Sequence, residues 1–223
     1  STVTVNDADA TAVTAAELSA IGGATTGTVT VTNAIAITGS TAQVTAALVS
    51  SGSLVEVTDA TVTINDTPTI AELNAIAGKT TGVVTATLAA TSTSDLGALT
   101  TGGTDEITIT VSDADGVALN AEDLSAIGGK TNGTVTVTNA VAISGTTAQV
   151  TAALVTAGTL VEVTDAAVTI DDTPTIAELN AIAAKTTGVV TATLAADSLA
   201  NLGSLTTAGT DDITITVNDA DAA

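Results

Sequence analysis

Pairs of aspartates separated by one alanine are the residues of this chain best suited to chemistry. They follow a β-like stretch three times, as Asp7 and Asp9, Asp113 and Asp115, and Asp219 and Asp221. Carboxylates at i and i+2 on a tight corner can share a Ca²⁺ ion, with backbone carbonyls and water completing its shell of about six to eight oxygen ligands. The pattern therefore predicts calcium at these corners. The alternative interpretation is turn chemistry, because aspartate side chains bond the backbone of tight turns.

Catalytic groups are scarce in this composition. The chain has no histidine, no cysteine and no aromatic residue, so an imidazole base and a thiolate nucleophile are both excluded. A carboxylate pair can act as acid and base, but the pairs recur along the chain, whereas an active site usually occurs once. We therefore expect no enzymatic activity.

The charge of the chain excludes two classes of partner. Three basic residues stand against 24 acidic ones, which gives a formal charge of −21. A polyanion repels nucleic acid phosphates and anionic lipid surfaces, so we expect no nucleic acid partner. Threonine interrupts every apolar run before the roughly 18 residues that a spanning helix needs, so we also expect no membrane insertion. The apolar 45% of the residues is too large a share for a disordered chain.

An internal repeat of 106 residues organises the chain. The stretch from Asp66 to Ala90 returns from Asp172 to Ala196 with one change, Gly78 to Ala184. Self-similarity at a fixed period is typical of arrays and solenoids. We predict two repeat units, residues 1–116 and 117–223, each made of four coils.

Each coil carries the signals of a short helix and of strands. Helix starts follow the capping-box pattern, as in Thr14 with Glu17, Ser40 with Gln43, and Thr69 with Glu72. Glycines such as Gly22 and Gly23 are expected to end the helices. Valine and threonine then alternate with period two, which indicates half-buried strands with a solvated threonine face.

The order of these elements predicts the fold class. Strands separated by helices favour parallel pairing with right-handed crossovers. We predict an α/β solenoid of about eight strand–corner–strand–short-helix coils with parallel β ladders. The alternative is two tandem α/β domains arranged as beads.

The phrase TIAELNAIAAKTTGVVTATLA, residues 175–195, resembles repeats of very large cell-surface proteins of cyanobacteria and other aquatic bacteria. Some of those proteins are RTX-type secreted proteins, adhesins or surface-layer components. The resemblance implies export and a structural or adhesive role at the cell surface, although the glycine-rich calcium nonapeptide of the RTX class is absent here.

These observations predict an extracellular structural repeat segment that forms a stalk, filament or surface-layer element. Exposed strand edges are templates for pairing, so we expect self-association of copies head to tail. The alternative is a binding module for ice, a glycan or a neighbouring surface protein. Its threonine rows resemble the ice-binding face of some β-solenoid antifreeze proteins, with Glu56 interrupting one row.

Overall fold

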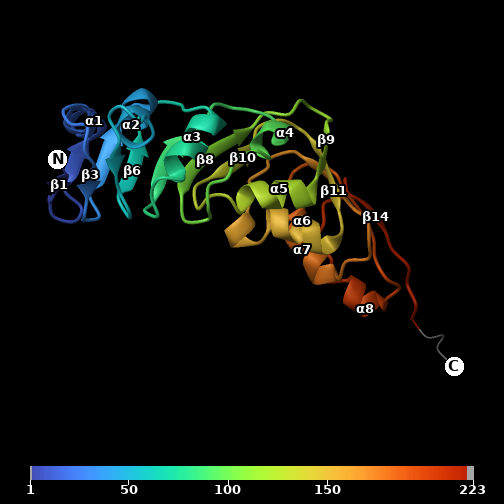
Figure 1. Cartoon of the computed structure of the whole chain (residues 1–223). Helices are drawn as coiled ribbons and strands as arrows, with labels where there is room; N and C mark the ends of the chain where they lie inside the picture. Colours follow the sequence, from blue (N-terminus) through green and yellow to red (C-terminus); the bar gives the residue numbers. More distant parts are fainter. Residues whose placement is uncertain (1, 220–223) are drawn as a thin grey trace. The chain divides into compact units, whose positions relative to one another are not determined.

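Short strands and short helices alternate along residues 2–219, the part of the chain that the computed structural model describes (Figure 1). The elements up to the middle of the chain are β1 (Val3–Val5), β2 (Ala12–Thr14), α1 (Ala15–Gly23), β3 (Val29–Val31), β4 (Ala36–Gly39), α2 (Thr41–Leu48), β5 (Val55–Glu56), β6 (Thr61–Ile64), α3 (Ile70–Ala77), β7 (Val84–Thr87), α4 (Thr93–Leu96) and β8 (Glu106–Val111). The remaining elements are β9 (Ala118–Asn120), α5 (Ala121–Gly128), β10 (Val135–Val137), β11 (Ala142–Gly145), α6 (Thr147–Leu154), the 3₁₀ turn η1 (Ala157–Thr159), β12 (Ala167–Ile170), α7 (Ile176–Ala183), β13 (Val190–Thr193), α8 (Leu199–Leu202) and β14 (Asp212–Thr214).

The described residues form two compact units that are interleaved along the chain. The first holds residues 2–90, 98–109 and 130–134, and the second holds residues 91–97, 110–129 and 135–219. The division into repeat units 1–116 and 117–223 stays a prediction beside this partition.

In the first unit, successive coils place their strands in two parallel sheets. One sheet has the order β1-β3-β5, and β2, β4, β6, β7 and β8 follow one another in the other. The chain runs from a strand of the first sheet through a corner to the second sheet and then into a helix. Helices α1 and α2 contact both β4 and β5, so they close the third side of the coil.

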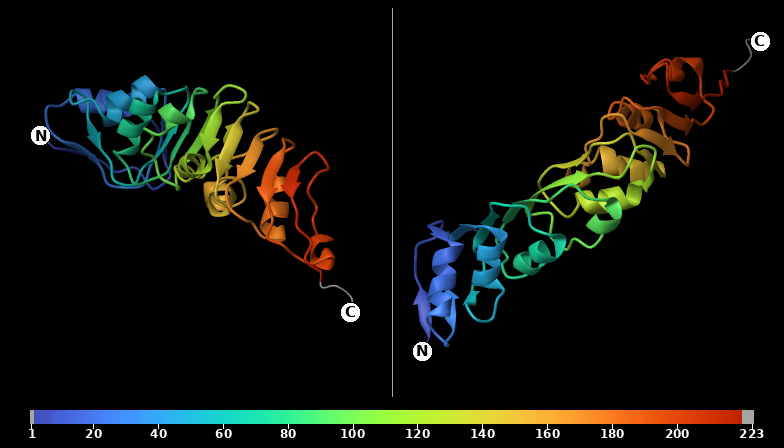
Figure 2. Two further views of the ribbon diagram at one scale, coloured as in Figure 1. Left: turned by 90° about the vertical axis from the view of Figure 1, so that its right-hand side faces the viewer. Right: turned by 90° about the horizontal axis from the view of Figure 1, so that it is seen from above.

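The second unit repeats the second of these sheets with the same register. Its sheet has the order β9-β11-β12-β13-β14. Ile37 lies opposite Val62 in the first unit, and Ile143 lies opposite Val168 at the same positions of the second. Figure 2 shows the arrows of neighbouring strands within a unit running in the same direction. Parallel sheets joined by helices confirm the predicted α/β class.

The core is built from aliphatic side chains of both sheets and of the helices. Val29, Ile37 and Leu48 are fully buried in the first unit, and Leu124 and Leu179 in the second. The predicted alternation holds in β6, β7 and β8, where buried valine, alanine or isoleucine alternates with exposed threonine or glutamate. Helices of four to nine residues are too short to be stable alone in water, so this packing stabilises them. No helix in residues 2–219 has the length and apolar character needed to cross a membrane.

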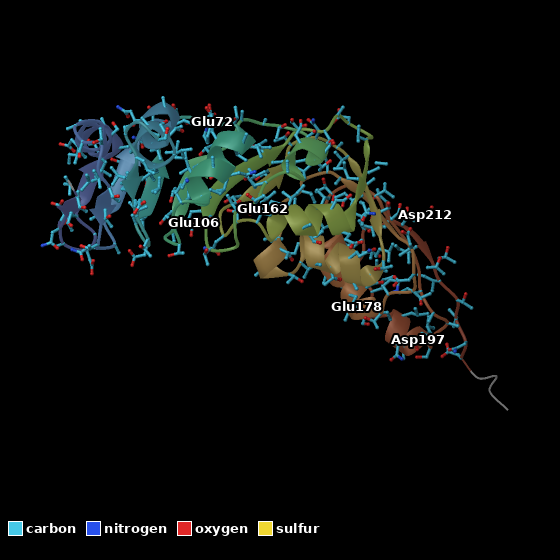
Figure 3. All side chains as sticks on the ribbon, in the orientation of Figure 1. Glu72, Glu106, Glu162, Glu178, Asp197 and Asp212 are labelled. Carbon is cyan, nitrogen blue, oxygen red and sulfur yellow. The ribbon has the colours of Figure 1, made fainter. Side chains whose placement is uncertain are left out.

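The three predicted capping boxes are present. At α3, the Thr69 hydroxyl accepts a hydrogen bond from the Glu72 amide at 3.3 Å, and the Thr69 amide donates to Glu72 Oε2 at 2.9 Å. The same reciprocal pair begins α1 and α2, and Thr175 with Glu178 repeats it at α7. Glu72 and Glu178 lie at the starts of these helices in Figure 3. Two backbone amides per helix, which the helix itself leaves unpaired, are thereby satisfied.

The prediction that Gly22 and Gly23 end the first helix is confirmed, because they are the last two residues of α1. Ala24 is the C-cap and keeps right-handed helical geometry with φ −81°. The Ala24 amide donates to the Ile21 carbonyl at 3.2 Å, so the last turn tightens instead of reversing its handedness. Gly22 also allows a close contact, because the backbone of Ser53 lies where a side chain at position 22 would be.

Candidate functional site

The predicted corner aspartates Asp113 and Asp219 bind the first amide of a helix in the preceding coil. Asp113 Oδ2 accepts from the Thr93 amide at 2.8 Å, and Asp113 Oδ1 accepts from the Thr93 hydroxyl at 3.3 Å. The two carboxylate oxygens of Asp219 lie 3.2 and 3.1 Å from the Leu199 amide. Thr93 and Leu199 are the first residues of α4 and α8. A carboxylate is favourable there because the helix dipole places positive charge at this end.

The second aspartate of a corner binds the following coil. Asp9 Oδ1 accepts from the Ala34 amide at 3.0 Å, and Asp115 Oδ1 accepts from the Ala140 amide at 3.0 Å. The main chain of the corner takes part as well, since the Asp113 carbonyl accepts from Asn139 Nδ2 at 2.7 Å. An Asp-Ala-Asp corner therefore contacts the coil before it and the coil after it.

These contacts join the corner aspartates to neighbouring coils, so they are neither bonds within the aspartates' own turn nor a metal site. Within residues 2–219, no group of three or more histidine, cysteine, aspartate or glutamate side chains is placed to hold a metal ion. The carboxylates of Asp113 and Asp115 bind amides of different coils. Asp221 lies outside the described residues. Calcium at Asp7, Asp9, Asp113, Asp115, Asp219 and Asp221 stays a prediction, and an ion there would need oxygens that these amides leave free.

Asp66 and Asp172, which begin the repeated stretch, make the same contact. Asp66 Oδ1 accepts from the Thr41 amide at 2.7 Å and from the Thr41 hydroxyl at 2.5 Å. Asp172 binds the Thr147 amide at 2.8 Å and also accepts from the Thr147 hydroxyl. Thr41 and Thr147 are the first residues of α2 and α6. The signal that could have found this contact is a threonine just after a cap residue with an aspartate 25 residues later, in both repeats.

Asp66, Asp113, Asp172 and Asp219 form one set, which we call the clasp aspartates. Each binds the first amide of a helix in the preceding coil, and the helices concerned are α2, α4, α6 and α8. At α1 and α5 a glycine stands in the following coil instead. A Cβ on Gly39 would lie 2.9 Å from the Ala15 Cβ, so the two coils pack closely at the start of α1. In each unit, the clasp and this close packing thus occur in different coils.

Other polar side chains also bind coil to coil. Buried Asp105 accepts from the Val84 amide at 2.9 Å, and Asp211 accepts from the Val190 amide at the same distance. The Thr80 hydroxyl donates to the Ala60 carbonyl at 2.5 Å. Asp105, Asp211 and Thr80 therefore also hold neighbouring coils together.

Hydrogen bonding lowers the pKa of several of these carboxyls. Donation from the Thr41 hydroxyl and amide lowers the pKa of Asp66 below its ordinary value of 3.8, and Thr147 has the same effect on the pKa of Asp172. Thr14 lowers the pKa of Glu17 below 4.5 in the same way. In each case the donors stabilise the ionised form more than burial opposes it.

We expect acid to destabilise the chain through these groups. A carboxyl whose pKa is lower in the folded state adds stability above its unfolded pKa, and that contribution disappears as the pH falls through the folded pKa. The melting temperature should therefore decrease when the pH is lowered below about 4.5. On acidification, the melting temperature of the double variant Asp66→Asn, Asp172→Asn should decrease less than that of the unmodified chain. Thermal melts followed by circular dichroism measure both.

The matched control for this prediction is Asp59→Asn with Asp165→Asn, two exposed corner residues. Each double variant removes two negative charges, so relief of charge repulsion affects both double variants alike. Equal acid sensitivity in the clasp variant and the unmodified chain would contradict a role for the two clasp carboxylates.

A hollow in the second unit lies beside α7 and α8. It has a volume of about 650 Å³ and a mainly apolar lining that includes Pro174, Ile176 and Leu194. Its polar groups are already bonded to the protein: Asn180 Nδ2 donates to the Ser204 carbonyl at 2.9 Å, and Asp197 Oδ1 accepts from Asn201 Nδ2 at 2.8 Å. Asp197 and Glu178 mark this region in Figure 3.

Comparisons with known proteins add no functional analogy. No protein-family model, no curated protein and no solved structure matches the chain.

Proposed function

We propose that this chain is a structural repeat segment of an extracellular surface protein, in which it forms part of a stalk, filament or surface-layer element. The observation that carries the proposal is the recurrence of the coil-to-coil contacts. Asp66 with Thr41 in the first unit corresponds to Asp172 with Thr147 in the second. A catalytic or ligand site usually occurs once, whereas a solution for joining coils must recur in every repeat. These aspartates and threonines are therefore best explained as structural contacts that hold neighbouring coils together.

We infer that the coils of each unit are segments of an α/β solenoid, about eight coils in all, in preference to two closed α/β domains. Neighbouring strands in the sheet β9-β11-β12-β13-β14 belong to successive coils of the chain. In a repeat array each coil contacts its neighbours, and stability grows as coils are added. This additive stability suits a stalk or filament, because coils can be added or removed without a change of fold.

The extracellular location rests on the resemblance of residues 175–195 to bacterial cell-surface repeats and agrees with the acidic, cysteine-free composition. Antibodies raised against the purified chain test it on cells that produce the protein. We expect labelling of intact cells, and equal labelling before and after permeabilisation. Labelling that requires permeabilisation would overturn the proposed location.

Calcium is the cofactor to test in this setting, because extracellular repeat proteins work at millimolar calcium. Melting curves in EDTA and in millimolar CaCl₂ should be compared for the unmodified chain and for Asp113→Asn with Asp115→Asn. A calcium-dependent rise in melting temperature that the double variant lacks supports a metal site at that corner. An equal melting temperature in both solutions restricts the corner aspartates to the hydrogen bonds described above.

A second candidate function is a binding module that uses the threonine face. Exposed Thr63 and Thr85 lie opposite each other on β6 and β7, and exposed Thr87 lies opposite Thr108 on β7 and β8. Parallel strands place such hydroxyls about 4.8 Å apart. Glu106 lies opposite Thr85 and interrupts the row. If the face binds ice, the unmodified chain should inhibit ice recrystallisation, and Thr63→Lys with Thr85→Lys should not. A glycan array or a neighbouring surface protein would be the next ligand to test.

A further inference from the structure

The hollow beside α7 and α8, two helices that Figure 1 labels, has the size and the walls of a ligand site. Its volume of about 650 Å³ lies within the range of about 300–1,000 Å³ that is typical of small-molecule pockets. In its lining, Pro174 and Leu194 are buried and Ile176 is half-buried. An apolar molecule in the hollow would displace water from apolar surface, which is favourable.

Asn180 fixes the two walls of the hollow relative to each other. Its Nδ2 donates to the Ser204 carbonyl at 2.9 Å, and its Oδ1 accepts from the Thr206 amide at 2.8 Å. Asn180 belongs to α7, whereas Ser204 and Thr206 follow α8. Helix α7 has eight residues and α8 has four, so α8 extends along about half the length of α7. The hollow is therefore a fixed feature of the fold, and it needs no rearrangement to receive a ligand.

The lining of the hollow includes the carboxylate of Asp197 (Figure 3). Its Oδ1 accepts from Asn201 Nδ2 at 2.8 Å and from the Ser198 amide at 2.7 Å. Donation by Asn201, and then by the Ser198 amide, lowers the pKa of Asp197 below its ordinary value of 3.8, so the carboxylate is ionised at neutral pH. The hydrogen bonds among residues 2–219 do not use Oδ2, which leaves this oxygen able to accept from a ligand.

The corresponding positions of the first repeat carry different polar residues. Thr91 corresponds to Asp197. Asp95 corresponds to Asn201, and its Oδ2 accepts from the hydroxyls of Thr91 and Ser92, each at 3.0 Å. The carboxylate of the first repeat is thus engaged at its own helix start. A contact that joins coils must recur in every repeat, whereas the Asp197 carboxylate is particular to the second repeat, as expected of a ligand site.

Charge selects the end group of the ligand. The lining contains no basic residue, and the chain has a formal charge of −21. A negative potential of this kind repels an anion and attracts a cation. A primary ammonium group has three N–H donors for a carboxylate oxygen.

We propose that the hollow binds a small molecule with an apolar body and a primary ammonium group. The apolar body covers Pro174 and Leu194, and the ammonium group donates to Oδ2 of Asp197. This binding site is additional to the proposed structural function and does not depend on it.

Three naphthalene probes that differ in their end group test the proposal. They are naphthylmethylammonium, the neutral naphthylmethanol and the anionic naphthylacetate. Because the chain has no aromatic residue, its side chains give no NMR signals among the ring protons of the probes in D₂O, and broadening of the probe signals on titration gives Kd. We expect the ammonium probe to bind about tenfold more tightly than the alcohol, the lower end for a hydrogen bond to a charged group, and the anion to bind most weakly.

The substitution Asp197→Asn separates the charge from the shape of the site. Asparagine keeps an oxygen for the Ser198 amide but carries no charge, so the ammonium probe should lose its advantage while the alcohol binds as before. Asp165→Asn is the matched control, because it removes one charge from an exposed residue of the same unit outside the lining. The control variant should retain the preference for the ammonium probe.

The substitution Ala177→Leu tests the place of binding. Ala177 is an exposed residue of the α7 wall, and leucine there fills part of the hollow while remaining a good helix former. We expect binding of the ammonium probe and of the alcohol to weaken together, by about tenfold or more. Ala200→Leu, at an exposed alanine of α8 outside the lining, is the control and should bind both probes like the unmodified chain. Thermal melts followed by circular dichroism confirm that all variants fold.

Each outcome decides the proposal. A preference for the ammonium probe that Asp197→Asn removes and Asp165→Asn retains, with binding that Ala177→Leu weakens, supports it. The absence of saturable binding of the ammonium probe to the unmodified chain overturns it. Equal affinities of the three probes, a preference that survives Asp197→Asn, or binding that Ala177→Leu leaves unchanged also overturn it, because attraction then comes from another surface or from the net charge of the chain.

Discussion

Gly22→Ala is expected to lower the free energy of unfolding by about 1–3 kcal/mol, the usual cost of overpacking a filled site. The substitution should be favourable on helix propensity alone, because Gly22 lies in α1 and alanine is the better helix former by about 1 kcal/mol. The new Cβ would lie 2.5 Å from the Ser53 carbonyl carbon and closer still to its oxygen. Ser53 is held in place by its hydroxyl, which donates to the Ala46 carbonyl at 2.6 Å. The loop and the helix must therefore separate.

Gly23→Ala is the matched control. Gly23 is the next residue of the same helix, and a Cβ there meets no atom within 4 Å. We expect this variant to be up to about 1 kcal/mol more stable than the unmodified chain. Urea unfolding followed by far-UV circular dichroism measures both, since a chain without aromatic residues has no tryptophan fluorescence. Stabilisation by both alanines would contradict the close approach of Ser53.

Thr131→Val is expected to cost about 1–3 kcal/mol, the penalty for buried polar groups left without partners. Thr131 is 5% exposed. Its hydroxyl oxygen accepts from the Ile107 amide at 2.7 Å and from the Gly133 amide at 2.8 Å. It also lies within donating distance of the Asp105 carbonyl, at 2.9 Å. Valine fills the same space but leaves the buried Ile107 amide without an acceptor.

Thr45→Val, in contrast, is not expected to lower the free energy of unfolding. In the described part of the chain, the hydroxyls of Thr45 and Thr151 are buried without a hydrogen-bond partner. Replacing a buried, unpaired hydroxyl by a methyl group removes a desolvation cost, so Thr45→Val should be neutral or stabilising by about 1 kcal/mol. The two valine variants are compared by urea unfolding under identical conditions. Equal losses at positions 45 and 131 would contradict this account of the hydroxyls.

Features that depend on a few neighbouring residues could be predicted from the sequence. The capping box joins residues three positions apart, so Thr69 and Glu72 meet in any helix that starts there. Alternation in a strand likewise specifies its buried face, and Val84 and Ala86 are buried while Thr85 and Thr87 are exposed. The α/β class with parallel pairing followed from these local patterns and from the repeat.

The position of Gly22 at a helix end was predicted, but its close approach to Ser53 was not, because the cause of that contact is not local. Glycine after an apolar helical stretch commonly marks a helix end, and nothing near Gly22 in the sequence distinguishes that purpose from room for another segment. The segment concerned is Ser53, 31 positions later. Its position depends on how the second coil packs on the first.

The clasp aspartates show the same limit. By itself, the sequence determined the corner at Asp113 and the helix start at Ser40. Only the tertiary structure decided that Asp66 and Asp113 bind the helix starts of the coil before them, at Thr41 and Thr93, 25 and 20 residues away. The capping box depends on the geometry of one helical turn, which the local chain specifies. The clasp depends on the stacking of two coils, which is decided by burial of aliphatic side chains from both sheets and the helices together.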